Sequence, residues 1–124
     1  MKFQKDETLF TGRIKSMGFA AKGAYKLIST EHSVMVQFSI TVIMIIVGIL
    51  VGITKEEWIM QTFACGLILS IEGLNTAVEK IADFVHPDYH ERIGFIKDIA
   101  AGAVFFAAMT AIAVASIIYV PYLL

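Results

Sequence analysis

The stretch VMVQFSITVIMIIVGILVGI, residues 34–53, contains no charged residue over twenty positions. A helix of this length is about 30 Å long, which matches the hydrocarbon core of a bilayer. The whole chain has the same bias: 57% of its 124 residues are hydrophobic and 17% are charged, and its mean hydropathy is +0.74. The sequence therefore predicts one membrane domain, because the chain is too short for two.

Two more apolar segments follow this first span. A second span is predicted over residues 58–84 and a third over residues 99–120, where Pro121 is expected to fray the helix. Residues 54–57 (TKEE) predict a tight turn between the first two spans. Residues 86–98 predict a longer polar loop between the second and the third.

Residues 12–29 predict a helix that lies on the membrane surface. At 100° per residue its apolar side chains form one stripe with basic residues beside it, as in helices that bind anionic interfaces. The apolar members are Ile14, Met17, Ala21, Tyr25 and Ile28, and the basic ones are Arg13, Lys15, Lys22 and Lys26. A basic segment that only sets the topology is the alternative. The predicted fold is an all-α membrane protein with three transmembrane helices and an N-terminal amphipathic surface helix.

The distribution of basic residues orients the chain. With three spans, the N-terminal segment and the polar loop lie on one side, which holds nine of the ten Lys and Arg residues, including Lys2 and Lys5; only Lys55 is opposite. By the positive-inside tendency that side is cytoplasmic, so we expect a multi-pass inner-membrane protein. The first 33 residues carry charges throughout, which predicts no cleaved signal peptide. The single Cys65 excludes an internal disulfide.

Four polar residues interrupt the second predicted span. Glu72, Asn75, Glu79 and Asp83 are spaced by 3, 4 and 4 residues, so on a helix they lie within a sector of roughly 80°. An acidic residue at the centre of a span costs roughly 2.5–3.5 kcal/mol, so this polar stripe must face protein, a metal or a cavity rather than lipid. Hydrogen bonds to neighbouring helices are the structural alternative, most of all for Asp83.

The depth of the two glutamates suggests different roles. If Trp58 marks the outer interface, Glu72 lies about 21 Å along the helix, inside the hydrocarbon, and Glu79 lies about 31 Å along it, at the cytoplasmic edge. A desolvated Glu72 could act as a general base towards a hydroxyl group. An ionised Glu79 could hold a divalent cation, and oxygen ligands without a Cys/His cluster favour Mg²⁺.

Other polar residues lie at the same cytoplasmic depth. Glu31 precedes the first span and could complete a metal site, or could only start a helix. Lys97, followed by Asp98, could neutralise phosphate oxygens, or could be a topology lysine. Tyr89 and His90 could contact a nucleotide or could be solvated loop residues. The chain has no GxxxxGK[ST] or GxGxxG loop, so any nucleotide site is not of the usual soluble types. Three spans are few to enclose a site, which suggests a homo-oligomer.

Two segments carry a family resemblance. EGLNTAVEKIAD (residues 72–83) and HPDYHERIGFIKDIAAGAV (residues 86–104) resemble the signature of the small prokaryotic diacylglycerol kinases, a family that includes the undecaprenol kinases. That pattern is approximately E-x-x-N-[ST]-A-[IV]-E-x-x-x-D, followed by a Tyr-His pair and a Lys-Asp pair. The resemblance extends from about residue 12 over nearly the whole chain.

The resemblance implies a homotrimeric lipid kinase with ATP as co-substrate and Mg²⁺ as cofactor. It assigns Glu72 as the catalytic base, supported by Asn75, and Glu31 and Glu79 as metal ligands. The nucleotide-binding positions that it implies are Arg13, Phe19, Asp88, Tyr89, His90, Lys97 and Asp98. Phe19 stands where well-known members have a tyrosine, so only stacking is expected there, and the spacing from Arg13 to Phe19 differs from the family's by one residue.

The predicted function is ATP- and Mg²⁺-dependent phosphorylation of a lipid alcohol at the cytoplasmic interface. The acceptor is either diacylglycerol, giving phosphatidic acid, or undecaprenol, giving undecaprenyl phosphate. The predicted partners are the lipid, ATP, the bilayer and further copies of the chain, with no nucleic acid. A small proton-coupled transporter that uses Glu72, and a non-catalytic assembly subunit, are the alternatives.

Overall fold

The computed structural model describes residues 8–124, and this part of the chain is all-helical, as predicted. Lys2 and Lys5, which we counted in the basic N-terminal segment, lie outside the described residues. The four helices that it contains are α1 (Leu9–Thr30), α2 (His32–Val51), α3 (Lys55–Val85) and α4 (Glu91–Leu123).

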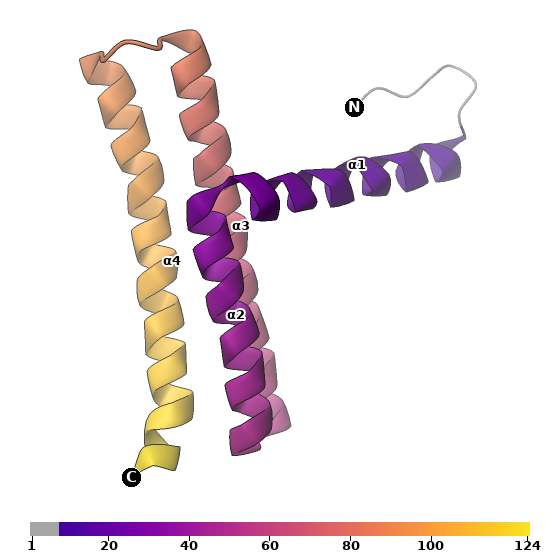
Figure 1. Ribbon diagram of the computed structural model, residues 1–124, viewed down its shortest axis with the longest axis vertical. Helices are drawn as coiled ribbons and strands as arrows, with labels where there is room; N and C mark the ends of the chain where they lie inside the picture. Colours follow the sequence, from indigo (N-terminus) through magenta and orange to yellow (C-terminus); the bar gives the residue numbers. More distant parts are fainter. Residues whose placement is uncertain (1–7) are drawn as a thin grey trace.

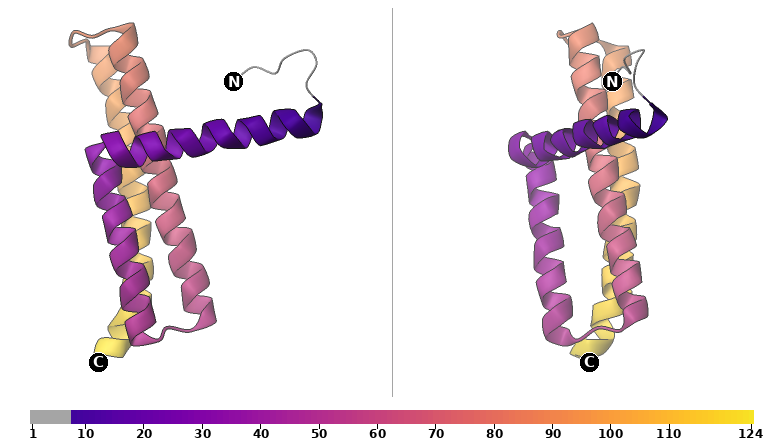
Figure 2. Two further views of the ribbon diagram at one scale, coloured as in Figure 1. Left: turned by 45° about the vertical axis from the view of Figure 1, so that its right-hand side comes forward. Right: turned by 90° about the vertical axis from the view of Figure 1, so that its right-hand side faces the viewer.

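Three helices run side by side and the fourth lies across them. Helices α2, α3 and α4 are aligned along the long axis of the molecule, whereas α1 crosses this direction and projects to one side (Figures 1 and 2). Helix α3 packs against both α2 and α4, and α1 contacts α2. Glu31, in an extended conformation (φ −102°, ψ 115°), is the single residue at the corner between α1 and α2.

Two of the described helices, α2 and α4, are long and apolar enough to cross a membrane. Their large side chains are widely exposed, for example Ile43, Leu50 and Phe106, at 56%, 80% and 74% of their surface. So much contiguous apolar surface is unusual for a protein in water, and it fits a hydrocarbon environment. Helix α3 does not meet the same test of composition, because ionisable residues interrupt its apolar sequence.

The connection between α2 and α3 is shorter than predicted. Gly52 ends α2 with a positive φ of 77°, which glycine adopts without strain. Thr54 then caps α3 with a capping box: its hydroxyl accepts from the Glu57 amide, and the Glu57 carboxylate accepts from the Thr54 amide. Residues 55–57 therefore belong to the first turn of α3, and the prediction that all of residues 54–57 form a turn was wrong.

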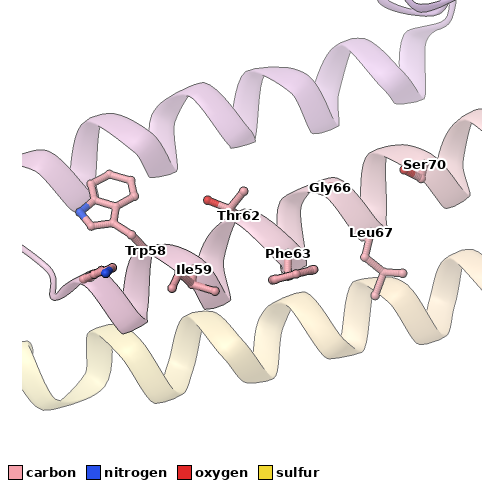
Figure 3. A pocket seen from close by; sticks show the side chains of 8 residues that line it. Trp58, Ile59, Thr62, Phe63, Gly66, Leu67 and Ser70 are labelled. Carbon is pink, nitrogen blue, oxygen red and sulfur yellow. The ribbon is translucent and has the colours of Figure 1, made fainter.

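Helices α2 and α3 approach closely near this connection. A Cβ atom at Gly48 would lie 2.8 Å from the Trp58 ring, so glycine is needed to admit the indole. Figure 3 shows the Trp58 side chain directed from α3 towards α2. Gly48 thus allows close packing of α2 against α3 within the chain.

The connection between α3 and α4 is also shorter than predicted. Residues 86–90 form the loop, and α4 begins at Glu91 because the His90 Nδ1 atom accepts a hydrogen bond from the Arg92 amide at 3.0 Å. Lys97 and Asp98 are therefore helical, not part of a loop. The predicted fraying at Pro121 was also wrong, since α4 continues to Leu123. A proline so near the end removes only one helical hydrogen bond.

A second set of polar residues joins the helices at the opposite end from the α3–α4 loop. Gln61 is buried at 5% exposure, and its amide nitrogen donates to the Met44 carbonyl at 3.1 Å. The Tyr119 hydroxyl donates to the Gln61 side-chain oxygen, so one residue of α3 is bonded to both α2 and α4. Close by, the Tyr122 hydroxyl donates to Glu57 at 2.6 Å. We call Met44, Gln61 and Tyr119 the outer network.

Candidate functional site

The four residues of the polar stripe lie on one continuous helix, α3, so their common face follows from its geometry. Their exposure increases along it. Glu72 is buried at 7% exposure, Asn75 is half-buried, and Glu79 and Asp83 are exposed. Glu72 is the one carboxylate that is buried within residues 8–124.

The hydrogen bonds of the stripe are incomplete. The Asn75 side-chain nitrogen donates to a Glu79 carboxylate oxygen at 3.3 Å, across one turn of α3. The Asn75 Oδ1 atom is buried and has no hydrogen-bond partner. The Glu72 carboxylate also accepts no hydrogen bond from another described residue. Buried polar groups are rarely left without partners, so the Asn75 oxygen is open to a further hydrogen bond or to a ligand.

At the far end of the stripe, Asp83 forms an ion pair with Lys97. The Lys97 Nζ atom lies 2.6 Å from Asp83 Oδ1 and joins α4 to α3. This contact favours the structural alternative for Asp83. It also places the Lys97 ammonium group beside the Asp83 end of the stripe, while Asp98 is exposed on the next position of α4.

Glu31 contacts α3 at Lys80, the residue that follows Glu79. Its carboxylate forms an ion pair with Lys80 at 3.0 Å and accepts from the Thr30 hydroxyl at 3.4 Å. Within residues 8–124, no group of three or more His, Cys, Asp or Glu side chains gathers closely enough to hold a metal ion. The carboxylates of Glu31 and Glu79, with the Asn75 oxygen that has no partner, have the ligand chemistry that Mg²⁺ prefers.

The remaining predicted nucleotide-binding residues are dispersed. Arg13 and Phe19 belong to the first half of α1, the half that points away from the other helices (Figure 2). Phe19 is half-exposed, with the Lys22 ammonium 5.8 Å from the centre of its ring. Asp88, Tyr89 and His90 lie in the loop at the end of the α3–α4 hairpin, which extends beyond α1 (Figure 1).

The loop residues have local structural roles that the sequence did not reveal. The Nδ1 atom of His90 caps α4, and its ring makes an edge contact with His86, with centroids 5.2 Å apart. Tyr89 is 86% exposed, and its ring covers the backbone at Gly94, where a Cβ would lie 3.3 Å from it. The second ring nitrogen of His90 and the Tyr89 hydroxyl remain available for a ligand.

A hollow of about 600 Å³ lies on another face of α3 (Figure 3). It is lined by side chains of this helix alone, among them Ile59, Phe63 and Leu67. Phe63 is nine residues from Glu72, so it lies about 180° around the helix from it. Since the hollow contains no carboxylate, imidazole or thiol, it is not part of the candidate site.

Comparison with known proteins identifies the family. A family profile described as "Prokaryotic diacylglycerol kinase" matches residues 18–119. The chain belongs to this family. The family predicted from the sequence is thereby confirmed, and the chain is a lipid kinase. The transporter and assembly-subunit alternatives are set aside.

Relatives of the chain are named for two different lipid acceptors. The chain is 30% identical over 109 residues to an undecaprenol kinase from Bacillus subtilis, covering 88% of this chain and 89% of that one. It is 25% identical over 105 residues to a diacylglycerol kinase from Escherichia coli K12, covering 85% and 86%. A diacylglycerol kinase from Synechocystis is 44% identical over 59 residues, covering 47% and 34%.

The family match covers most of the predicted site residues. It includes the polar stripe, Glu31 and the positions from Asp88 to Asp98, and it begins one residue before Phe19. Arg13 lies outside it. The contacts of Lys80 and Gln61, which join helices far apart in sequence, were not predicted, because no periodic pattern along one helix indicates a partner on another.

Proposed function

We propose that the chain transfers the terminal phosphate of ATP, with Mg²⁺, to the hydroxyl group of a membrane lipid. The observation that carries this proposal is the burial of Glu72, together with the gradient of exposure from Glu72 to Glu79 along one face of α3. A hydroxyl group at the membrane interface could meet Glu72 from the apolar side, while a water-soluble phosphate donor approaches from the exposed side.

The proposed placement in the bilayer uses three spans. Helices α2 and α4 are long and apolar enough to be spans, and we propose α3 as the third, since it packs against both of them. The α3–α4 loop and α1 then lie on the cytoplasmic side of an inner membrane, in agreement with the distribution of basic residues. Glu72 lies within the hydrocarbon under this placement.

An apolar groove supports a lipid acceptor. A cavity of about 270 Å³ lies between α2, α3 and α4, and Cys65 and Ile68 of α3 are among its lining residues. Ile68 precedes Glu72 by one helical turn, so the groove leads along the same face towards the carboxylate. We propose that the hydrocarbon chain of the acceptor occupies it, with the hydroxyl group at Glu72.

In the proposed reaction, the acceptor oxygen forms a bond to the terminal phosphorus as the bond to ADP breaks. Glu72 accepts the hydroxyl proton as general base. Asn75 orients Glu79 through their hydrogen bond. Glu31 and Glu79 would hold Mg²⁺, which neutralises phosphate charge when bound. Lys97 and Asp98 would contact the phosphates, while Tyr89, His90 and Asp88 would contact the rest of the nucleotide.

The dispersal of the predicted nucleotide-binding residues supports a homotrimer. Arg13 and Phe19 lie on the half of α1 that points away from the stripe of their own chain (Figure 2). In an oligomer this half could reach the stripe of a neighbouring subunit. A site assembled between subunits would also fit the absence, within residues 8–124, of any group of three or more His, Cys, Asp or Glu side chains that could hold a metal ion.

The acceptor is either diacylglycerol or undecaprenol, since relatives carry both names. The test is phosphate transfer from Mg-ATP in mixed micelles to diacylglycerol, monoacylglycerol and undecaprenol, each with wild type and with Glu72→Gln. We expect at least one lipid to be phosphorylated well above the Glu72→Gln background, and the product profile identifies the preferred one. The proposal fails if no lipid is phosphorylated above the Glu72→Gln background.

A further inference from the structure

Another cavity, mainly apolar but with charged groups in its lining, lies between α1 and α3, beside the corner at Glu31. Its volume is about 620 Å³, and its lining residues include Gly23 and Lys26 of α1 and Thr76 and Lys80 of α3. Glu72, Asn75 and Glu79 do not line it. It is therefore separate from the polar stripe, on a neighbouring face of the same helix.

The cavity carries an excess of positive charge. It contains two lysines, Lys26 and Lys80, and one carboxylate, Glu31. Glu31 is paired with Lys80 at 3.0 Å, whereas Lys26 forms no ion pair with another residue in the described range 8–124. A phosphate group could lie between the two ammonium groups, which act as point charges towards its oxygens.

A threonine hydroxyl group at the cavity is available to a ligand. Thr76 lines the cavity and is only 5% exposed as a residue, and it forms no hydrogen bond with any other residue of the described chain. A hydroxyl group can donate one hydrogen bond to a ligand. A phosphate oxygen in the cavity could accept its hydrogen.

Small residues keep the cavity open. A Cβ atom at Gly23 would meet no atom within 4 Å, so it would extend into free space. A Cβ at Gly73, across the cavity on α3, would lie 3.1 Å from the Leu27 side chain. A larger side chain at Gly23 would therefore fill the cavity without distorting its walls.

We propose that this cavity binds the phosphate of an anionic membrane lipid. The proposal depends on the membrane placement given above, and the cavity shares Glu31, a proposed Mg²⁺ ligand, with the proposed active site. In that placement α1 lies in the cytoplasmic interface, at the depth of the lipid headgroups, where basic side chains bind anionic lipids. The phosphate lies between Lys26 and Lys80, and the lipid chains extend towards the hydrocarbon.

The test measures lipid selectivity without ATP. Purified protein is placed in phosphatidylcholine vesicles containing a trace of spin-labelled phosphatidylglycerol or spin-labelled phosphatidylcholine, and electron paramagnetic resonance gives the relative association of each label. We expect wild type to prefer phosphatidylglycerol. Each of Lys26→Gln and Lys80→Gln should lower this preference about five-fold, because a lysine near the surface contributes about that factor.

Matched variants separate a built site from general surface attraction. Gly23→Leu fills the cavity without changing the charge and should also lower the preference. Gly18→Leu, on the same helix and also open at its Cβ, should leave it unchanged. The proposal is overturned if Lys22→Gln lowers the preference as much as Lys26→Gln while Gly23→Leu has no effect. Circular dichroism shows whether each variant is folded.

Inorganic phosphate distinguishes a headgroup site from a site for free phosphate. We expect the preference for phosphatidylglycerol to persist when inorganic phosphate is added at about the concentration of the lipid. Displacement of the label would assign the cavity to free phosphate and overturn the headgroup site. Glu72→Gln should keep the wild-type preference, so a failure here is distinguishable from a failure of the proposed function.

Discussion

Both ends of α3 carry polar residues in an apolar helix, but the hydrogen bonds of these residues are complete at one end and incomplete at the other. In the outer network, Gln61 is bonded to Met44 on one side and to Tyr119 on the other. In the polar stripe, Glu72 accepts no hydrogen bond from a described residue and the Asn75 Oδ1 atom has no partner. A completed network stabilises helix packing, whereas an incomplete one leaves groups free for a ligand.

The largest expected effect follows from removing the proposed base. Glu72→Gln keeps the size of the side chain and removes its basicity, so the rate of lipid phosphorylation should fall by about 10²–10⁴. The melting temperature in detergent should not fall, since a neutral amide is easier to bury than a carboxylate. Glu56→Gln, the same change at an exposed position of α3, is the control and should retain the rate.

Variants of Lys97 and Asp83 distinguish a role of Lys97 in contacting phosphate from a structural role of its ion pair with Asp83. If Lys97 contacts the phosphates, Lys97→Met should lower the rate by about 10–100-fold, as for other charged groups that stabilise transferred phosphate. Asp83→Asn breaks the same ion pair but leaves the ammonium group in place. It should have little effect on the rate, because so exposed a pair contributes about 1 kcal/mol or less to stability. Equal losses in the two variants would show that the pair itself matters.

Substitutions in the outer network should lower the free energy of unfolding. Tyr119→Phe removes the donor to Gln61 and leaves a buried oxygen without a partner, which should destabilise the helix packing by about 1–3 kcal/mol. The double variant Gln61→Leu with Tyr119→Phe should lose less than the sum of the two single variants. Unfolding in a titration with sodium dodecyl sulfate measures this. Strict additivity would mean that the two side chains are not coupled.

The smallest expected effect is at the capping box. The Thr54 backbone amide donates to Glu57 and lowers the pKa of its carboxyl group below 4.5, and the Tyr122 hydroxyl acts in the same direction. A carboxyl whose folded pKa is lowered adds stability above its unfolded pKa and loses it as the pH falls through the folded value. The melting temperature of wild type should therefore drop slightly more than that of Glu57→Gln below about pH 4.5. Parallel curves would contradict this.

Patterns along one helix were predictable from the sequence. The spacing of Glu72, Asn75 and Glu79 places them on one face whatever surrounds the helix, and α2 follows from its length and composition alone. The capping box was also visible, since Thr54 and Glu57 have the S/T-x-x-E spacing, but we interpreted that segment as a turn.

Contacts between helices were not predictable in the same way. Gln61 and Tyr119 are 58 residues apart, and the partner of Glu31 is Lys80, on a different helix. Histidine is an uncommon N-cap, so the start of α4 at Glu91 had no clear signal in the sequence. The roles of the predicted site residues remain proposals for the experiments above.

The most direct test measures rate and melting temperature together for Glu72→Gln and Tyr119→Phe in the same detergent. The expected result is a crossed pattern: Glu72→Gln loses phosphate transfer to lipid and keeps its melting temperature, while Tyr119→Phe, which removes the hydrogen bond to Gln61, loses melting temperature and keeps its rate per folded molecule. If Glu72→Gln transfers phosphate at the wild-type rate, Glu72 is not the base and the central claim is wrong.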